Sequence, residues 1–346
     1  MSEIIQPNSP TELAAALAEA NRAQRLVAPR GGGTKIDWGN PGARPDIVLS
    51  TAKLNRVIEH AWADMTATVE AGCTVAELQR TLAQHRQRLA IDPLWPDRAT
   101  IGGILATNDS GALRLRYGSL RDLIIGITVA LPDGTIAMSG GKVVKNVAGY
   151  DLPKLMTGAL GTLGVITQAI FRLHPLPAHS QTLTAKMSTM EAAQMLMLAI
   201  QDSQLAHSAL QFRTSTLDVD ILFEGTEAGI AAQRKFVCTL APFTESTPEV
   251  WSARERLWPA EAVVKFSVLP SEIASVPFTD AVIQATGIGY TKLDHARRDL
   301  DTVTILTPSK LDAWPAAGDT LALMRAVKHQ FDPNAILNRG RYVGGI

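Results

Sequence analysis

The pattern of hydrophobic and polar positions along the first hundred residues shows two spacings. Apolar residues three and four positions apart predict a helix after Ser9, where Glu12 completes a capping box. A second capping box, Thr74 with Glu77, begins another amphipathic helix. Short apolar or alternating runs predict strands at 26–28 (ending at Pro29), 47–50, 56–60 and 66–71. These elements together indicate a mixed α/β domain, and neither a helical bundle nor a β-sandwich.

Beyond residue 178 the pattern predicts a second region of helices and strands. Helices are expected at 188–200, 227–240 and 319–331, and strands at 210–213 and 219–223. Asp332 and Pro333 end the last helix. The second region, from about 178 to 300, therefore has an α+β pattern.

Glycine is concentrated in the middle of the chain. Nearly half of the 26 glycines lie between residues 100 and 166, although glycine weakens regular elements. Tight turns explain some of them, as at 132–134. Turns would not require Gly102 and Gly103 within an apolar run. The distribution therefore favours a backbone held close to a large ligand.

The run from Arg30 to Thr34 has the chemistry of an anion-binding loop. Its three glycines can present backbone N–H groups to a pyrophosphate, and the Thr34 hydroxyl adds a donor. A glycine-rich surface loop is the alternative interpretation. Further candidate loops lie at 96–103, 142–151 and 158–166. Dinucleotide-binding, P-loop, G-x-S-x-G and H-E-x-x-H motifs are all missing, so a Rossmann or nucleotide-hydrolase function is not favoured.

Composition and charge exclude several classes of function. Lys+Arg and Asp+Glu balance at 33 each and aromatic residues make up 5%, so neither nucleic acid nor anionic lipid is an expected partner. Cys73 and Cys238 are too few for a disulfide framework, and both are expected to be small buried residues. The N-terminus lacks a signal-peptide pattern, and the longest uncharged stretch (155–171) is too short for a transmembrane segment. We therefore expect a cytoplasmic protein.

Six motifs occur in an order that resembles the FAD-binding domain of the vanillyl-alcohol oxidase superfamily, also called PCMH-type. They read RGGGT at 30–34, VEAG at 69–72, ATIGG at 99–103, RYG at 116–118, KNVAGYD at 145–151 and GTLGVI at 161–166. Within the superfamily, the chain is similar to the FAD-binding subunits of glycolate oxidase, the smaller flavin-type chain of that complex. The resemblance is dense over residues 10–178 and returns at 332–334 and 337–338.

This resemblance implies an α+β fold in which a PCMH-type FAD-binding domain contains two α/β subdomains. The FAD-binding domain would span 1–178, an inserted α+β cap domain on the substrate side would span 179–300, and 301–346 would return to the FAD domain. Many members link FAD covalently through a His just after the glycine loop. Lys35 follows Thr34 here, so we expect FAD to be bound non-covalently.

By position, the resemblance assigns cofactor contacts in three groups. The pyrophosphate would be held by Gly31, Gly32, Gly33 and Thr34, and Pro29 and Arg30 would be further cofactor contacts. The pyrophosphate and ribityl region would contact Ala99, Thr100, Ile101, Gly102 and Gly103, followed by Thr107 and Gly111. The adenine or ribose would pair with Val165 and Ile166 from the strand backbone, and Gly161 and Gly164 would be further cofactor contacts.

The substrate side departs from the family pattern. Related 2-hydroxy-acid dehydrogenases hold a metal with a His-rich stretch in the second domain, and the seven histidines here do not form that stretch. No metal is therefore expected. The family's Asn-Pro-Gly ending reads NRGR at 338–341.

Candidate catalytic residues remain unassigned. Arg116, Arg121 and Lys145 could pair with a substrate carboxylate, although bracing a glycine loop is the alternative. Tyr150 and Asp151 could take part in acid–base chemistry, but Asp151 is also placed to cap a helix.

The resemblance leaves several functions open. The chain could be an FAD-binding subunit that helps oxidise glycolate, a small 2-hydroxy acid, to glyoxylate. Its implied partners are a larger FAD-binding subunit and an iron–sulfur subunit, which could hold it peripherally at the inner membrane. Alternatives are a non-catalytic flavin-carrying scaffold or electron relay, and a stand-alone FAD-dependent 2-hydroxy-acid dehydrogenase. A flavin reductase of the cell-wall precursor pathway shares the flavin domain and is a further alternative.

Overall fold

The computed structural model describes residues 2–142, 150–258, 262–292, 304–306 and 312–346. The chain divides into two compact units. The first comprises Met1–Ser110, Ser119–Pro175 and Pro308–Ile346, and the second comprises Gly111–Gly118 and Leu176–Thr307. The sequence did not predict that 111–118 would leave the first unit. This stretch forms the short helix α4 (Arg114–Tyr117), which packs against β12 (His207–Arg213).

A three-stranded parallel sheet lies at the start of the first unit. Its strands are β1 (Glu3–Ile5), β3 (Ile47–Ser50) and β2 (Val27–Arg30), in that order, and helix α1 (Pro10–Arg22) follows β1. The Ser9 hydroxyl caps α1 by accepting the Glu12 N–H at 3.1 Å. The Glu12 carboxylate accepts the N–H of Asn8 at 2.8 Å, one residue before the predicted partner. The N-terminus of the helix is therefore capped by a modified capping box.

The predicted end of the first strand at Pro29 is wrong, because β2 continues to Arg30. β2 lies at the edge of its sheet and pairs with β3 on one side. The Val27 N–H points to the other side, where it donates to Ile336 O at 2.8 Å. Backbone N–H groups two residues apart in a strand point to the same side, so the nitrogen of Pro29 also faces away from β3. The pairing with β3 therefore loses no hydrogen bond to the proline.

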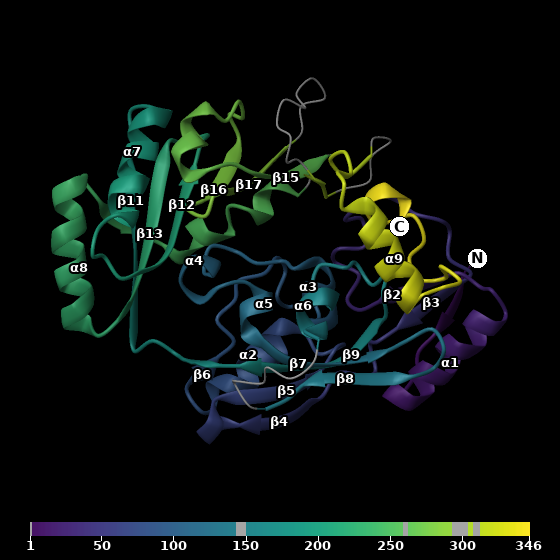
Figure 1. Ribbon diagram of the computed structural model, residues 1–346. Coiled ribbons are helices and arrows are strands. Elements are labelled where there is room, and N and C mark those ends of the chain that lie inside the picture. Colours follow the sequence, from purple (N-terminus) through teal and green to yellow (C-terminus); the bar gives the residue numbers. More distant parts are fainter. Residues whose placement is uncertain (1, 143–149, 259–261, 293–303, 307–311) are drawn as a thin grey trace. The chain divides into compact units, whose positions relative to one another are not determined.

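A five-stranded antiparallel sheet forms the centre of the first unit. Its order is β4 (Val57–Ala61), β5 (Thr66–Glu70), β9 (Val165–Arg172), β7 (Ile124–Ala130) and β8 (Ile136–Gly140). The helices beside it are α2 (Val75–Ala83), α3 (Ile101–Thr107), α5 (Leu120–Leu123) and α6 (Leu152–Met156), which lie over one face (Figure 1). Val69, Ile127 and Phe171 point from the strands into the buried core that these helices cover.

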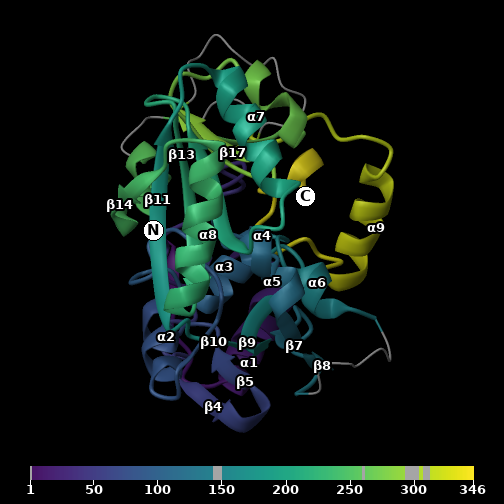
Figure 2. The ribbon, with the colours of Figure 1, turned by 90° about the vertical axis from the view of Figure 1, so that its left-hand side faces the viewer.

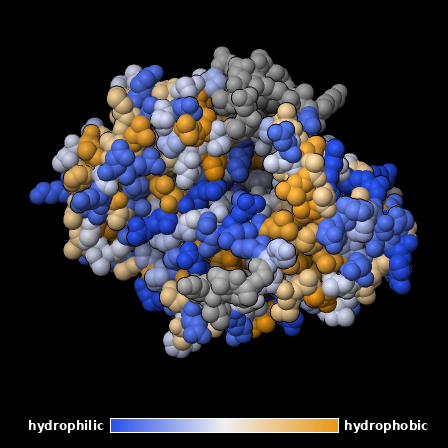
Figure 3. Space-filling model, viewed as in Figure 1, coloured by the Kyte–Doolittle hydropathy of each residue, from blue (hydrophilic) through white to orange (hydrophobic). Residues whose placement is uncertain are grey.

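Shorter elements complete the first unit. Strand β6 (Gln87–Arg88) pairs with β10 (His174–Pro175), and helix α9 (Leu321–Phe331) lies in the last segment. Short 3-10 turns across the two units lie at Trp62–Asp64, Pro248–Ser252, Glu255–Leu257, Pro270–Ser275 and Val343–Gly345. Apolar side chains gather over α9 on the surface (Figure 3), where Leu323 is 67% exposed. None of the helices in the described ranges combines the length and apolar character needed to cross a bilayer.

A buried ion pair attaches the end of α9 to the rest of the first unit. Lys328 Nζ donates to Asp332 Oδ2 at 2.6 Å and to Thr162 O at 2.7 Å. The Asp332 carboxylate also accepts the N–H groups of Ile336 and Leu337, at 3.1 and 2.8 Å. Burial lowers the pKa of Lys328, and Asp332 partly offsets that effect. Each charge is stabilised by the other, because both side chains are buried away from water.

The second unit is built on an eight-stranded antiparallel sheet. Its order is β14 (Thr244–Ser246), β11 (His179–Lys186), β13 (Asp218–Gly225), β12, β16 (Ala281–Gln284), β17 (Ile288–Lys292), β15 (Val263–Ser267) and β18 (Thr304–Ile305). Helices α7 (Met190–Gln201) and α8 (Glu227–Leu240) lie side by side over β11 and β13 (Figure 2). Phe212, Phe223 and Ile200 belong to the core between the helices and the strands.

The two cysteines differ in their environment. Cys73 is buried as predicted, and burial raises the pKa of its thiol to about 11. Cys238 is exposed, so the prediction that it is buried is wrong. α8 buries only Ile230 and Val237, and the residue after Val237 lies about 100° further round the helix.

We expect the substitution Asp332→Ala to lower the free energy of unfolding by about 3–5 kcal/mol, because it leaves the buried Lys328 charge unpaired. Urea-induced unfolding followed by circular dichroism measures the loss. The control Asp319→Ala removes an exposed carboxylate just before the same helix, and we expect a change within about 0.5 kcal/mol. Equal stability of the two variants would contradict this role of the ion pair.

Candidate functional site

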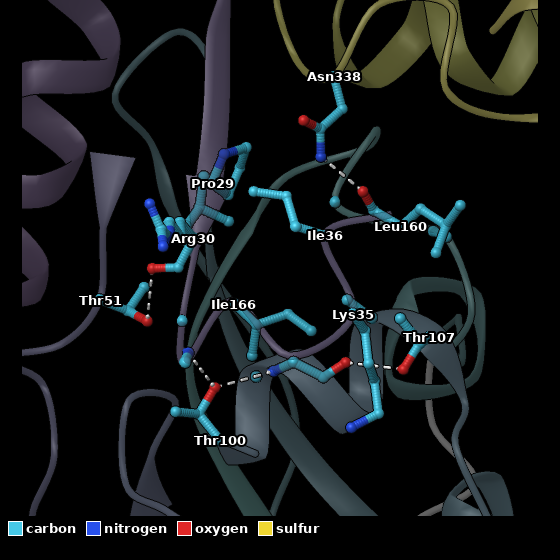
Figure 4. A pocket seen from close by; sticks show the side chains of 18 of the residues that line it. Pro29, Arg30, Lys35, Ile36, Thr51, Thr100, Thr107, Leu160, Ile166 and Asn338 are labelled. Carbon is cyan, nitrogen blue, oxygen red and sulfur yellow. Dashed lines mark hydrogen bonds between the residues drawn. The ribbon is translucent and has the colours of Figure 1, made fainter. Parts of the chain in front are cut away.

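A pocket in the first unit is formed by segments that lie far apart in the sequence. It contains about 820 Å³ of empty space, part of it open to solvent. Figure 4 shows side chains from the glycine-rich loop, from α3 and from the loop before β9 meeting around it. Asn338 and Arg341 of the last segment also line the pocket.

Most of the residues predicted at the site line this pocket. They are Pro29, Arg30, Gly31, Gly32, Gly33, Thr34, Thr100, Gly102, Gly103, Thr107, Gly161, Gly164, Val165 and Ile166. Val165 and Ile166 begin β9, where they pair with Ala130 and Val129 of β7. The structure therefore brings together three of the four predicted loops. The fourth, 142–151, lies for the most part (143–149) outside the described residues.

The glycine-rich loop packs directly against the segment before α3. A Cβ atom at Gly31 would lie 2.1 Å from Thr100 Oγ1, and one at Gly32 would lie 1.9 Å from the carbonyl oxygen of Arg98. No side chain can occupy either position without moving the backbone. This close approach explains why glycine is needed at both positions.

The same loop leaves backbone donors available at the pocket. The N–H groups of Gly31, Gly33 and Thr34 donate to no acceptor in the described part of the chain. The Gly32 N–H makes a long hydrogen bond of 3.4 Å to Thr100 Oγ1. Backbone N–H groups are normally paired, and consecutive free ones form an anion-binding concavity. The loop can therefore hold a phosphate group through its backbone.

The loop at 96–103 differs from the first, because protein acceptors already occupy its N–H groups. Ile101 N donates to Cys73 O at 2.9 Å, and Gly102 N donates to Ala71 O at 2.7 Å. The Thr100 hydroxyl caps α3 by accepting the Gly103 N–H at 3.3 Å. This segment therefore contributes the surface of a short helix to the pocket, and few free backbone donors.

The structure does not place three of the predicted residues at the pocket. Ala99 and Ile101 are fully buried in the core between the five-stranded sheet and its helices. Neither residue lines the pocket. Gly111 begins the short stretch that belongs to the second unit. Adjacency to a motif could not show which way each residue faces.

The charged side chains around the pocket are all basic. Arg30, Lys35 and Arg341 line it, and none of its lining residues is Asp or Glu. Lys35 is buried, and its Nζ lies 3.3 Å from Asp109 Oδ2 and donates to Leu94 O at 3.2 Å. Asp109 offsets the charge of Lys35, so the positive charge left for an anionic ligand comes from the two arginines.

Asn338 and Arg341 are site residues that the sequence analysis did not assign. Asn338 Nδ2 donates to Leu160 O at 2.7 Å (Figure 4). The Arg341 guanidinium donates to Lys35 O and Ile36 O, both at 2.8 Å. Burial lowers the pKa of Arg341 to about 10, and the Asp37 charge partly offsets this. The altered NRGR ending was the one sequence signal that pointed to this segment.

The candidate residues for substrate chemistry have other roles in the described structure, or lie outside it. Arg121 donates to Thr157 O through Nε and Nη2, at 3.3 and 2.8 Å, and so braces the loop before β9. Asp151 caps α6 by accepting the Lys154 N–H at 3.1 Å, and Tyr150 is 92% exposed. Arg116 lies on α4 in the second unit, and Lys145 is outside the described residues.

Metal ligation has no candidate group in the part of the chain that the structure describes, where no three His, Cys, Asp or Glu side chains converge. The pocket has the donor set of a site for a long anionic ligand with apolar parts. Free N–H groups and arginines suit a diphosphate, while Met156, Leu163 and Ile166 suit aromatic rings. These residues fit FAD.

Two family matches lie on either side of Leu176–Thr307, the long stretch of the second unit. Residues 1–139 match the FAD binding domain, and residues 315–342 match the C-terminal domain of FAD linked oxidases. The two matches contain the glycine-rich loop and the Asn338–Arg341 segment, which meet at the pocket.

Curated relatives include a glycolate oxidase subunit and two dehydrogenases. Glycolate oxidase subunit GlcD of Bacillus subtilis is 33% identical over 209 residues, which are 60% of this chain and 44% of that protein. The mitochondrial D-lactate dehydrogenase [cytochrome] of Arabidopsis thaliana is 27% identical over 88% of this chain and 57% of its own length. The D-2-hydroxyglutarate dehydrogenase of Xanthomonas citri is 30% identical over 66% of this chain and 48% of its own length. The chain thus spans about half the length of these relatives.

A solved structure shares the fold over almost the whole chain. Alkyldihydroxyacetonephosphate synthase superposes with a TM-score of 0.72 at 18% identity, covering 97% of this chain and 76% of that one. The fold is therefore the PCMH-type FAD-binding fold that the sequence predicted. Together, the two matches show that this chain contains an FAD binding domain and a segment of the C-terminal domain of FAD linked oxidases, and that its cofactor is FAD.

Proposed function

We propose that the chain is an FAD-binding subunit of a complex that oxidises a small 2-hydroxy acid such as glycolate to glyoxylate. In this proposal FAD lies in the pocket of the first unit, and electrons pass from the flavin to a partner subunit. The relatives support the substrate class, because glycolate, D-lactate and D-2-hydroxyglutarate are all 2-hydroxy acids.

One observation carries the placement of FAD. The free N–H groups of Gly31, Gly33 and Thr34 lie in a pocket whose charged lining residues are all basic. A diphosphate accepts hydrogen bonds from such donors and is stabilised by the nearby arginines. We propose that the loop holds the diphosphate and that Val165, Ile166 and Gly164 lie beside the adenosine part.

Bound FAD supplies the redox chemistry by accepting a hydride equivalent from the substrate carbon. The chain supplies position and electrostatics. Thr100 and Thr107 lie on the α3 side of the pocket with hydroxyl groups that already accept or donate hydrogen bonds to the helix backbone. We propose that they border the ribityl chain. Lys35 follows the loop where a covalently linking His stands in other members, so we propose non-covalent binding.

Two features support a role in a complex. The relative from Bacillus subtilis is named as a subunit of glycolate oxidase, and α9 exposes apolar side chains such as Leu323 and Met324. Exposed apolar patches of this kind suit a protein contact. We propose a larger FAD-binding subunit and an iron–sulfur subunit as partners. A scaffold or electron-relay role without turnover is the second candidate.

The substitution Gly32→Ala is expected to weaken FAD binding by about tenfold or more, because its Cβ would lie 1.9 Å from a backbone oxygen and displace the loop. Fluorescence titration of the FAD-free protein measures the dissociation constant. The control Gly318→Ala adds a Cβ with nothing within 4 Å and should bind FAD like the natural chain. Unchanged FAD affinity in Gly32→Ala would contradict the placement of the cofactor.

A visible spectrum of the purified chain tests the cofactor and the reaction together. We expect flavin bands near ~370 and ~450 nm that are released as free FAD on denaturation. The isolated chain should turn over glycolate little or not at all, because the proposed reaction passes its electrons to a partner. A ~450 nm band that persists under anaerobic glycolate would favour the relay or scaffold role. D-Lactate serves as the parallel substrate.

Other outcomes of that experiment separate the alternatives. Complete bleaching and turnover by the isolated chain would contradict dependence on a complex and favour a stand-alone dehydrogenase. FAD that stays attached to the denatured chain would contradict non-covalent binding. A reconstituted complex that oxidises glycolate equally well with FAD-free chain would favour the scaffold role.

A further inference from the structure

Residues 336–342, near the end of the last segment of the first unit, contact two parts of the pocket that are distant in the sequence. Asn338 reaches the loop before β9 by donating from Nδ2 to Leu160 O at 2.7 Å. Arg341 reaches the turn that follows the glycine-rich loop. We infer that Arg341 is a positioning residue for FAD, which holds the glycine-rich loop in its cofactor-binding conformation. This inference rests on the proposed place of FAD in the pocket.

The Arg341 guanidinium donates to three carbonyl groups in and just after that turn. Nη2 donates to Lys35 O and Ile36 O at 2.8 Å each, and Nε donates to Trp38 O at 3.1 Å. Residues 34–37 form a turn without helix or strand pairing. Its own hydrogen bonds are long, at 3.4 Å from Ile36 N to Gly33 O and 3.2 Å from Trp38 N to Lys35 O. The conformation of the turn therefore depends on the guanidinium.

The backbone of the same segment is attached to neighbouring positions. Arg341 O accepts hydrogen bonds from Asn40 N at 3.0 Å and from Trp314 Nε1 at 3.1 Å. A Cβ at Gly39 would lie 2.7 Å from Arg341 O. The side chain of Arg341 thus extends from a well-anchored backbone, so that it can hold the turn rather than follow it.

The positive charge of Arg341 favours an anionic ligand in the pocket. Arg341 lines the pocket and makes no ion pair within the described ranges of the chain. Burial of a cation without an ion pair is costly, and here burial lowers its pKa to about 10. An anionic diphosphate at Gly31–Thr34 would stabilise the charged guanidinium. Binding of FAD and docking of Arg341 should therefore reinforce each other, as reciprocal coupling requires.

Arg339 provides a matched control two residues away. Its guanidinium donates to Ala335 O at 2.8 Å and Asn334 O at 3.0 Å, both within its own part of the chain. It does not line the pocket that is proposed for FAD. Removing Arg339 therefore deletes the same kind of side chain from the same segment and leaves the hydrogen bonds from Arg341 to Lys35 O, Ile36 O and Trp38 O in place.

The test compares FAD binding by the full chain with Arg341→Ala and with Arg339→Ala. We expect Arg341→Ala to bind FAD about 10- to 100-fold more weakly, as expected for lost hydrogen bonds from a charged donor, mainly through faster dissociation. Arg339→Ala should bind within about twofold of the natural chain. Guanidinium ion at concentrations of tens of millimolar, against equal sodium chloride, should partly restore FAD affinity in Arg341→Ala alone, because it replaces the missing donors.

The possible failures are distinguishable. If the natural chain binds no FAD, the proposed function is wrong and not merely this inference. If the natural chain binds FAD, and Arg341→Ala binds it equally tightly, or guanidinium ion restores nothing, the positioning role is overturned. If Arg341→Ala does not fold, Arg341→Lys takes its place. Lysine keeps the charge but not the planar set of donors, so an affinity equal to that of the natural chain would also overturn the inference.

Discussion

The close packing of the glycine-rich loop against residues 98–100 is the constraint on which the cofactor site depends. Gly31 and Gly32 have no side chains, so the loop lies directly against Arg98 O and the Thr100 hydroxyl. The backbone of the loop itself therefore lines the pocket, because no side chains of Gly31 and Gly32 stand in between. Its free N–H groups are available to a ligand for that reason. The Thr100 hydroxyl oxygen accepts hydrogen bonds from both the loop and α3, because it accepts the Gly32 N–H and also caps α3 through the Gly103 N–H.

The remaining part of the site is supplied by residues near position 340. Lys328 and Asp332 attach the end of α9 to Thr162 and to the backbone at 336–337. Leu337 pairs with Val27 beside β2, which positions Asn338 and Arg341 at the pocket. A buried ion pair outside the pocket thus determines where two of the lining residues lie. The regions that match the FAD binding domain and the C-terminal domain of FAD linked oxidases therefore meet at one pocket, although they are distant in the sequence.

Sequence reasoning succeeded where the signal is local. The RGGGT and GTLGVI motifs are contiguous, and the capped helices at Ser9 and Thr74 carry their cap residues within four positions. It failed where the outcome depends on packing. The inward direction of Ala99 and Ile101 and the exposure of Cys238 follow from which face is covered. The contacts of Arg341 join residues whose spacing in the chain carries no local signal.

The separation in sequence between the two sides of the pocket has a consequence for biosynthesis. Lys35 and Arg341 are 306 residues apart, with the whole second unit between them. A ribosome that adds about 5–20 residues per second needs roughly 15–60 s to travel that distance. During this interval the nascent chain has its glycine-rich loop but not the residues that hold the turn after it. If Arg341 holds the turn as we infer, tight cofactor loading follows translation of the inserted unit.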